Sequence, residues 1–195
     1  LRRRARAGPV DPPDAQGDTP LLLAVRHRQQ AATDLLLDAG ADPDHVSGGW
    51  SVLAEAAYQD SVLDRSTAFV ARLLAAGADP SPAGHPPLLC VVNQEGSSAA
   101  VLRRLLAAGA DVAASGDDGE TVLHRIADLA GAALVDVALD AGAPIEARDR
   151  RDRTPLMAAA DAGNHAAFRR LAERGADVTA RDRDGRTAAD LLDPD

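Results

Sequence analysis

The sequence contains no lysine, a single cysteine and few aromatic residues, and each scarcity excludes a class of function. All 21 basic residues are arginine, so the phosphate-binding loop that ends in Gly-Lys-Ser or Gly-Lys-Thr is absent. The single Cys90 excludes an internal disulfide framework and a cysteine-rich zinc module. The only aromatic residues are Trp50, Tyr58, Phe69 and Phe168, which leaves bases almost no stacking platform and a cofactor little aromatic lining.

Charge and hydropathy exclude two further classes of partner. The 195 residues are 46% apolar and 26% charged, which is typical of a globular chain, and their net charge is −9. This negative balance opposes DNA binding, because phosphates need a positive surface. No apolar run approaches the ~18 residues that a membrane span needs, so we expect no membrane interaction. Abundant alanine and the use of arginine alone indicate a GC-rich coding sequence and a bacterial source, and the lone cysteine favours the cytoplasm.

Two short signatures recur along the chain in step with each other. A glycine-alanine signature stands at residues 40–42, 77–79, 109–111, 142–144 and 175–177, with spacings of 37, 32, 33 and 33. A capping signature stands at Thr19-Pro20-Leu21, Ser51-Val52-Leu53, Pro86-Pro87-Leu88, Thr121-Val122-Leu123, Thr154-Pro155-Leu156 and Thr187-Ala188-Ala189. The distance between the two signatures is longer in the second and third units. We therefore expect insertions at residues 60–66 and 93–98.

Each unit predicts two short helices and a turn. Thr or Ser accepts backbone hydrogen bonds at a helix start, and a proline directly after it fills the first helical position at no cost in hydrogen bonds. A second apolar stretch ends near Ala-Gly, where glycine supplies the left-handed conformation that ends a helix. The following residues are rich in Asp, Gly, Ser and Arg, which is typical of a projecting turn.

This repeat resembles the ankyrin-repeat family, whose unit of ~33 residues begins with Thr-Pro-Leu-His. The tetrad stands as Thr121-Val122-Leu123-His124 in the fourth unit and as Thr154-Pro155-Leu156-Met157 in the fifth. The resemblance covers residues 16 to 192 and implies an all-α repeat solenoid of helix pairs with projecting β-turn or hairpin fingers. Local departures are Pro144 in place of Asp and Pro86 in place of the capping Thr.

The period also divides the chain. We expect five repeats within residues 16–183, at about 16–47, 48–83, 84–115, 116–148 and 149–181. A short capping helix is predicted in 182–195, with a polar outer face. Residues 1–15 form either an arginine-rich tail or the remnant of a preceding repeat. Because the sequence begins with Leu, we expect a truncated chain or a start codon read as Leu.

No arrangement of residues predicts catalysis, a metal or a cofactor. Cys90 falls on an inward position of its helix, so we expect it to be buried as a small apolar residue. The resemblance implies that His124 hydrogen-bonds neighbouring backbone and a Thr hydroxyl. The other histidines are in different repeats and lack metal-ligand spacing. The chain is therefore predicted not to be an enzyme.

The resemblance implies that a partner docks on the finger tips and on the exposed ends of the first helices. Trp50 lies at a tip and Tyr58 two helical turns later, and both residue types are enriched in binding hot spots. The alternative is that Trp50 folds back onto the neighbouring turn, or that Tyr58 covers the long insertion between the helices. Position in the repeat assigns six more residues to the helix ends: Arg26, His27, Gln59, Asn93, Gln94 and Asp128.

Arginines are concentrated on the last two fingers, and they form the second part of the predicted site: Arg148, Arg150, Arg151, Arg153, Arg183 and Arg186. Guanidinium groups suit carboxylates, so an acidic face on the partner is the matching expectation. The alternative is that the interleaved aspartates neutralise a solvated surface.

These features together predict a non-catalytic scaffold that is a monomer by itself and binds another protein. An inhibitor or immunity-type binder is a sharper version of this interpretation. Two alternatives stay open. The repeats could serve as a regulatory or targeting array of a larger enzyme, or the arginine-rich fingers could bind RNA or a phosphorylated ligand, with an affinity that falls steeply with salt.

Overall fold

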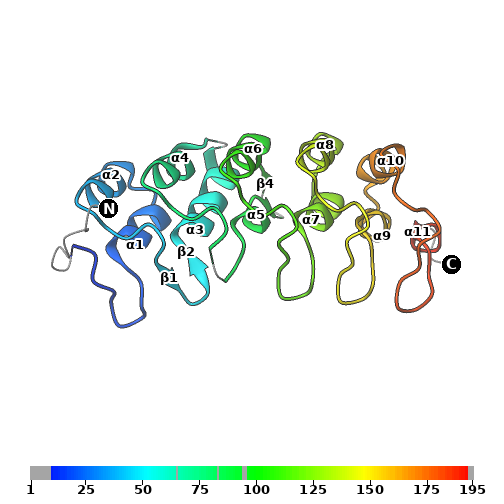
Figure 1. The fold of residues 1–195 in the computed structure, drawn as a ribbon, viewed down its shortest axis with the longest axis horizontal. Coiled ribbons are helices and arrows are strands. Elements are labelled where there is room, and N and C mark those ends of the chain that lie inside the picture. Colours follow the sequence, from blue (N-terminus) through cyan, green and yellow to red (C-terminus); the bar gives the residue numbers. More distant parts are fainter. Residues whose placement is uncertain (1–9, 65, 83, 94–95, 193–195) are drawn as a thin grey trace.

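The computed structural model describes residues 10–64, 66–82, 84–93 and 96–192, which fold as a row of helix pairs (Figure 1). The first helices of the five pairs are α1 (Pro20–Arg26), α3 (Val52–Gln59), α5 (Pro87–Cys90), α7 (Val122–Leu129) and α9 (Pro155–Asp161). The second helices are α2 (Gln30–Asp38), α4 (Ala68–Ala75), α6 (Ala99–Ala107), α8 (Ala132–Asp140) and α10 (His165–Glu173). A last short helix, α11 (Ala188–Leu192), packs beside α9. The predicted solenoid is confirmed.

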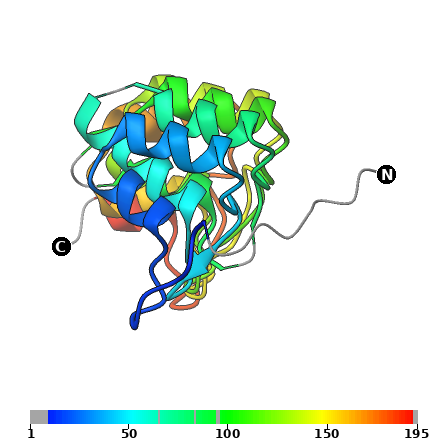
Figure 2. The same cartoon turned by 90° about the vertical axis from the view of Figure 1, so that its left-hand side faces the viewer.

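The two kinds of helix form two layers. In the end-on view the helices of successive repeats lie behind one another, and the connections between repeats project from the first-helix layer (Figure 2). Between the layers runs a continuous core in which the same position of each repeat is filled by a buried leucine: Leu21, Leu53, Leu88, Leu123 and Leu156. Each repeat therefore buries its apolar face against its neighbours, as expected for a solenoid.

Side chains at the capping signature start most of the first helices. Thr19 Oγ1 accepts from the Leu22 amide at 3.2 Å, Ser51 Oγ from Ala54 at 3.0 Å and Thr154 Oγ1 from Met157 at 3.3 Å. Pro86 offers no such acceptor, and α5 is only 4 residues long. The departure of the third repeat from the signature thus coincides with its shortest helix.

Both predicted insertions have defined structure. After α3, the chain continues as a π-helical turn at Asp60–Asp64, labelled η1. After α5, strands β3 (Val92–Asn93) and β4 (Gly96–Ser97) pair antiparallel, with Val92 opposite Ser97. One more hairpin pairs β1 (Val46–Ser47) with β2 (Trp50–Ser51) in the connection before α3. The predictions for residues 1–9, Gln94 and the last three residues lie outside the described part of the chain.

Candidate partner-binding surface

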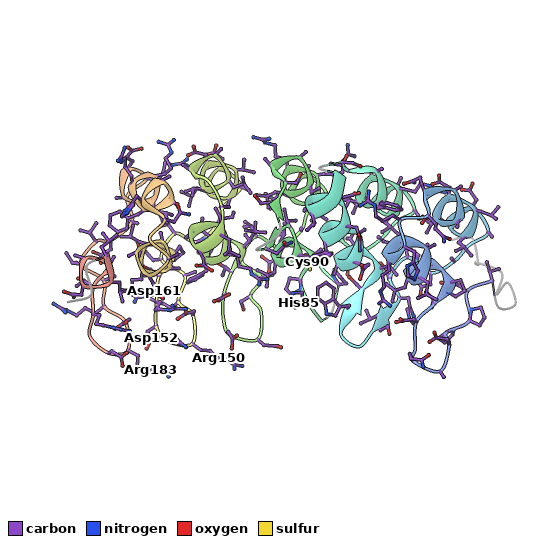
Figure 3. The ribbon with its side chains drawn as sticks, turned by 180° about the vertical axis from the view of Figure 1, so that it is seen from behind. His85, Cys90, Arg150, Asp152, Asp161 and Arg183 are labelled. Carbon is purple, nitrogen blue, oxygen red and sulfur yellow. The ribbon has the colours of Figure 1, made fainter. Side chains whose placement is uncertain are left out.

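The connections between repeats, here called fingers, lie side by side, and backbone hydrogen bonds join three neighbouring pairs of them. They comprise residues 41–51, 78–82 with 84–86, 110–121, 143–154 and 176–187. The amide of His85 donates to Gly49 O, that of Arg150 to Asp118 O and that of Arg183 to Arg151 O, each at 2.9 Å. Between the second and third fingers the bond involves a side chain, because the Asp111 amide donates to Ser81 Oγ at 2.8 Å. Neighbouring fingers are thus tied together, and all of them project from the same layer of helices (Figures 1 and 3).

Trp50 folds onto the next finger, as in the alternative given above. Its ring stacks on that of His85 with the centroids 4.9 Å apart and the planes 19° from parallel. The contact depends on Gly84, which has φ of +98°, because a Cβ there would lie 2.6 Å from the carbonyl oxygen of Gly49. Trp50 nevertheless stays 37% exposed, so part of the indole is open to solvent.

A cavity of about 290 Å³ adjoins this aromatic pair. It lies where three successive fingers meet, and its walls include Gly49, Trp50, Gly84, His85, Gly116 and Asp117. Burial lowers the pKa of His85, and the nearby Arg125 guanidinium acts in the same direction, while the Asp117 carboxylate opposes them more weakly. The imidazole is therefore neutral at pH 7. The role of His85 was not predictable from the sequence, because its contact with Trp50 joins two repeats.

The predicted helix-end residues differ in how accessible they are. His27 and Asp128 are exposed, whereas Arg26, Tyr58 and Asn93 are half-buried. Arg26 contacts Asp18 at 2.5 Å, and this hydrogen bond both lowers the pKa of the Asp18 carboxyl and raises that of the arginine. The ends of the first helices thus present some exposed side chains and others that are partly buried or bonded within the protein.

Gln59 lies elsewhere than its predicted groove position. It is 7% exposed, and its Nε2 donates to Glu55 Oε1 at 2.8 Å. Gln59 is the last residue of α3, and the chain continues directly into the π-helical turn η1, so this position does not lie at an open helix end. Little of this side chain is left for a partner to touch.

Three of the six predicted arginines hold groups of the protein itself. Arg153 is 15% exposed, and its guanidinium contacts Asp149 at 2.8 Å and Asp161 at 3.0 Å. Arg186 contacts Asp182 in the same way at 2.9 Å. Arg148 donates to two finger carbonyls, those of Asp152 at 2.6 Å and Arg181 at 2.8 Å.

The last two fingers contain the same ion pair, between an aspartate and the arginine four residues after it, and this pair is here called the clasp: Asp149 with Arg153, and Asp182 with Arg186. Burial raises the pKa of the Asp149 carboxyl, but hydrogen bonds from the backbone and guanidinium of Arg153 outweigh it and leave the pKa below its usual value. The balance at Asp182 is the same, with Arg186 as donor. The spacing of four between each aspartate and its arginine was visible in the sequence and could have indicated this structural role.

The other three predicted arginines are more open. Arg150 and Arg183 make loose contacts of 3.8 Å with Asp118 and Asp152, in pairs whose side chains are all more than half exposed. Within the described residues, the exposed Arg151 side chain makes no ion pair. Figure 3 shows Arg150, Asp152 and Arg183 at the finger tips, whereas Asp161 lies at the level of the helices.

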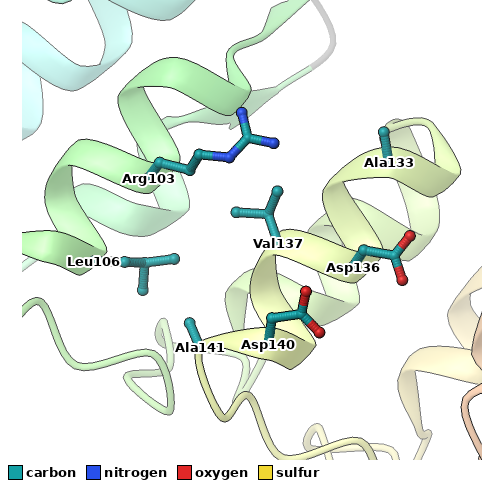
Figure 4. Close-up of a pocket in the computed structure, with 7 residues that line it drawn as sticks. All are labelled: Arg103, Leu106, Ala133, Asp136, Val137, Asp140 and Ala141. Carbon is teal, nitrogen blue, oxygen red and sulfur yellow. The ribbon is translucent and has the colours of Figure 1, made fainter.

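A second hollow lies on the opposite layer, between α6 and α8 (Figure 4). It measures about 510 Å³ and is lined by Arg103, Leu106, Val137 and both Asp136 and Asp140. Asp136 is bonded to Arg170 and Arg174 of the next repeat, at 2.8 and 2.6 Å. The two aspartates thus serve the joint between α8 and α10, and the hollow is a shallow gap beside that joint.

Two side chains that could act as a nucleophile or a base, those of Cys90 and His124, are buried and belong to different repeats. Cys90 is 3% exposed, and burial raises the pKa of its thiol to about 12. His124 is 2% exposed, and its Nδ1 accepts from the Thr121 amide at 3.2 Å while its Nε2 donates to Arg153 O at 3.0 Å. Both expectations for these residues are confirmed. In the part of the chain that the structure describes, no three His, Cys, Asp or Glu residues are grouped as metal ligands would be.

Comparison with known families accounts for this architecture. A model described as ankyrin repeats in three copies matches residues 88–182, and a single ankyrin repeat matches residues 16–47. Together the matches cover more than half of the sequence. The chain belongs to the ankyrin-repeat family. Ankyrin repeats are generally protein–protein interaction modules and are typically non-catalytic.

Solved ankyrin domains share the fold over nearly the whole chain. The ankyrin repeat domain of Bcl-3, from the IkappaB protein family, is 25% identical with a TM-score of 0.75, over 92% of this chain and 79% of that one. The human ASB11 ankyrin repeat domain is 25% identical with a TM-score of 0.80, over 94% and 80%. The comparison with curated proteins gives no match. Among the described helices of this ankyrin array, none has the length and apolar character to cross a membrane.

Proposed function

We propose that this ankyrin array is a non-catalytic scaffold that binds one protein partner on the face made by the fingers and the ends of the first helices. The observation that carries the proposal is the set of hydrogen bonds between neighbouring fingers, three of them between backbones and one from the Asp111 amide to Ser81 Oγ, which limits the movement of the side chains that the fingers present. A surface held rigid before binding loses little conformational entropy when a partner docks.

The residues available on this face give the proposal its chemistry. Trp50, His27, Asp128 and Arg151 are exposed, and Trp50 offers a large contact area with few rotatable bonds. The arginines that clasp their own fingers support the geometry of the face and are not offered as contacts. An acidic partner would meet Arg150, Arg151 and Arg183 at the last two tips.

Affinity capture from the source cell tests the proposal. We expect the wild-type chain to retain a specific protein, and the double variant Trp50→Ala, Arg151→Ala to retain much less of it. The matched control is Arg103→Ala, which removes an exposed arginine from α6 on the opposite layer. Equal recovery by the double variant and the wild type would contradict the proposed face.

An inhibitory or immunity-type role is the more specific version of this function. A rigid face without a catalytic cluster fits a protein that covers the active site of its partner. The test is to assay any captured enzyme with and without the ankyrin chain. Activity that falls in proportion to complex formation supports inhibition, and unchanged activity contradicts it. Attachment of the array to a larger enzyme would instead require catalytic residues outside this sequence.

Binding of RNA or a phosphorylated ligand is the second candidate, and the free side chain of Arg151 favours it. Such binding predicts that log affinity falls with log salt by about 0.7 for each phosphate contacted on a single strand. Bonds within the fingers already occupy Arg148, Arg153 and Arg186. Few arginines are therefore left to contact phosphates, and we favour the protein partner.

We further propose that the chain acts as a monomer in the bacterial cytoplasm. The support is compositional. A lone, buried cysteine fits a reducing compartment, and arginine without lysine fits a GC-rich coding sequence.

A further inference from the structure

The cavity beside Trp50 and His85 has walls of an unusual composition. The lining residues are four glycines, the aromatic residues Trp50 and His85, and Pro86, Ser115 and Asp117, and no arginine is among them. With His85 neutral at pH 7, Asp117 is the only charged group in the lining. An anion placed here would meet a negative charge with no compensating cation in the wall, so the site favours a cation.

The aromatic pair narrows the choice of cation. Aromatic faces attract a positive charge, and a planar guanidinium can stack on a ring and still bond a carboxylate with two N–H groups. The ring of Trp50 is held in place by its stack on His85, and the exposed Asp117 lines the cavity from the next finger. Both contact types that an arginine side chain uses are therefore present in one cavity.

Size and surrounding charge agree with this occupant. The volume of about 290 Å³ lies at the lower limit of ligand pockets, which are roughly 300–1,000 Å³, and suits one side chain better than a free metabolite. The stretch from Val10 to Pro82, which contains the first finger and the beginning of the second, has 11 acidic residues against 4 arginines. The nearby Arg125 is turned to the protein, since it donates to Leu89 O at 3.0 Å. An acidic flank steers a basic segment toward the site.

We infer that this cavity is a receptor for an arginine side chain from an exposed segment of the protein partner, with Trp50 and His85 as the stacking wall and Asp117 as the bonded carboxylate. The inference rests on the proposed function, and it gives the partner a basic residue at the centre of the array. The acidic partner face expected opposite Arg150, Arg151 and Arg183 would lie farther along the same binding segment. A partner of mixed charge, basic and then acidic, follows from the order of the fingers.

Peptide selection tests the inference without knowledge of the partner. A library of random linear peptides displayed on phage is selected against the wild-type chain, and the strongest binder is synthesised. Trp50 is the only tryptophan, so its fluorescence reports occupation of the cavity directly. We expect the selected peptides to share an arginine, and replacement of that arginine by citrulline, which keeps the shape but removes the charge, to weaken binding about tenfold.

Asp117→Asn gives the matching change on the protein. It should weaken the arginine peptide about tenfold and leave the citrulline peptide almost unchanged, because the lost interaction is the same one. Glu173→Gln, which removes an equal charge from α10 in the opposite layer, should alter neither affinity.

Three results would overturn the inference. They are selected peptides without a shared arginine, an Asp117→Asn variant that binds like Glu173→Gln, and binding that leaves Trp50 fluorescence unchanged. If the peptides bind only at the finger tips near Arg151, the cavity is not the receptor for arginine, but the proposed function still holds. If no peptide binds to the finger face, the result contradicts both the arginine receptor and the proposed binding face.

Discussion

At the scale of single residues, His124 joins two repeats through a neutral imidazole. One nitrogen accepts from Thr121 and the other donates to the carbonyl of Arg153, and burial lowers the pKa of the ring. The folded state therefore excludes a proton that the unfolded chain binds below its ordinary pKa of about 6.5. The stability that His124 supplies is present above that pH and is lost as the pH falls toward the lowered value of the folded state.

The variant His124→Ala measures this contribution. At pH 8 we expect it to lower the free energy of unfolding by about 2–3 kcal/mol, from two lost hydrogen bonds and a cavity. The difference from wild type, followed by urea denaturation, should shrink as the pH is lowered from 7 to 5. A difference that stays constant over this range would contradict the neutral state of His124.

Arg153 and Arg151 are two positions apart and provide a matched pair. Arg153→Ala leaves the buried Asp149 without its guanidinium partner, and we expect a loss of about 2–3 kcal/mol. Arg151→Ala removes an exposed side chain and should change the free energy of unfolding by less than about 0.5 kcal/mol. Equal effects in thermal or urea denaturation would show that the clasp is not structural.

Residues whose role depends on their own repeat were predictable, and those that depend on another repeat were not. The inward position of Cys90 follows from local spacing, the bond of His124 to its own Thr121 is what the resemblance implies, and both are observed. The stack of Trp50 on His85 joins fingers that are 35 positions apart, so sequence order carried no signal for it. The groove position of Gln59 was misplaced because nothing in the sequence indicated that α3 continues into a π-helical turn.

At the scale of elements, η1 contributes an unusual cap to the next helix. Asp60 is fully buried, and its Oδ2 accepts from the amide of Val70 at 3.0 Å near the start of α4. Burial raises the pKa of this carboxyl. We expect Asp60→Ala to cost about 1–2 kcal/mol by leaving that amide unbonded.

The isosteric change Asp60→Asn is the control for this cap. Its amide oxygen can still accept from Val70, and it no longer carries a charge that burial opposes, but its NH2 group takes the place of Oδ1, which has no hydrogen-bond partner among the described residues. We therefore expect a loss smaller than that of Asp60→Ala, below about 1 kcal/mol. Urea denaturation followed by circular dichroism measures both variants. A larger loss for Asn than for Ala would contradict the capping role.

Helix starts were the most predictable elements. Thr19, Ser51 and Thr154 accept the hydrogen bonds that their residue types predict. The spacing alone located the two insertions, but it did not predict their conformations. A π-helical turn and a hairpin of two short strands depend on packing against neighbouring repeats. Local preference decides where a helix begins, and tertiary contacts decide how an extra segment folds.

At the scale of the whole molecule, α11 closes one end of the core. Ala188 is 2% exposed, and Leu191 and Leu192 pack partly against the core. Because a solenoid is stabilised by contacts between neighbours, removal of residues 187–195 should expose α9 and lower the free energy of unfolding by about 1–3 kcal/mol. Hydrogen exchange should show the greatest loss of protection in α9 and α10. Uniform loss along the array would indicate that all repeats unfold as one unit.

The burial of Cys90 has a practical consequence for measuring this protein in solution. A thiol that is 3% exposed and has its pKa raised to about 12 is almost fully protonated at neutral pH and shielded from electrophiles. A maleimide dye should therefore leave the native chain unlabelled and attach only to a cysteine introduced on purpose, for example at Arg151. The array can thus carry a fluorophore at a chosen finger without any substitution in its core.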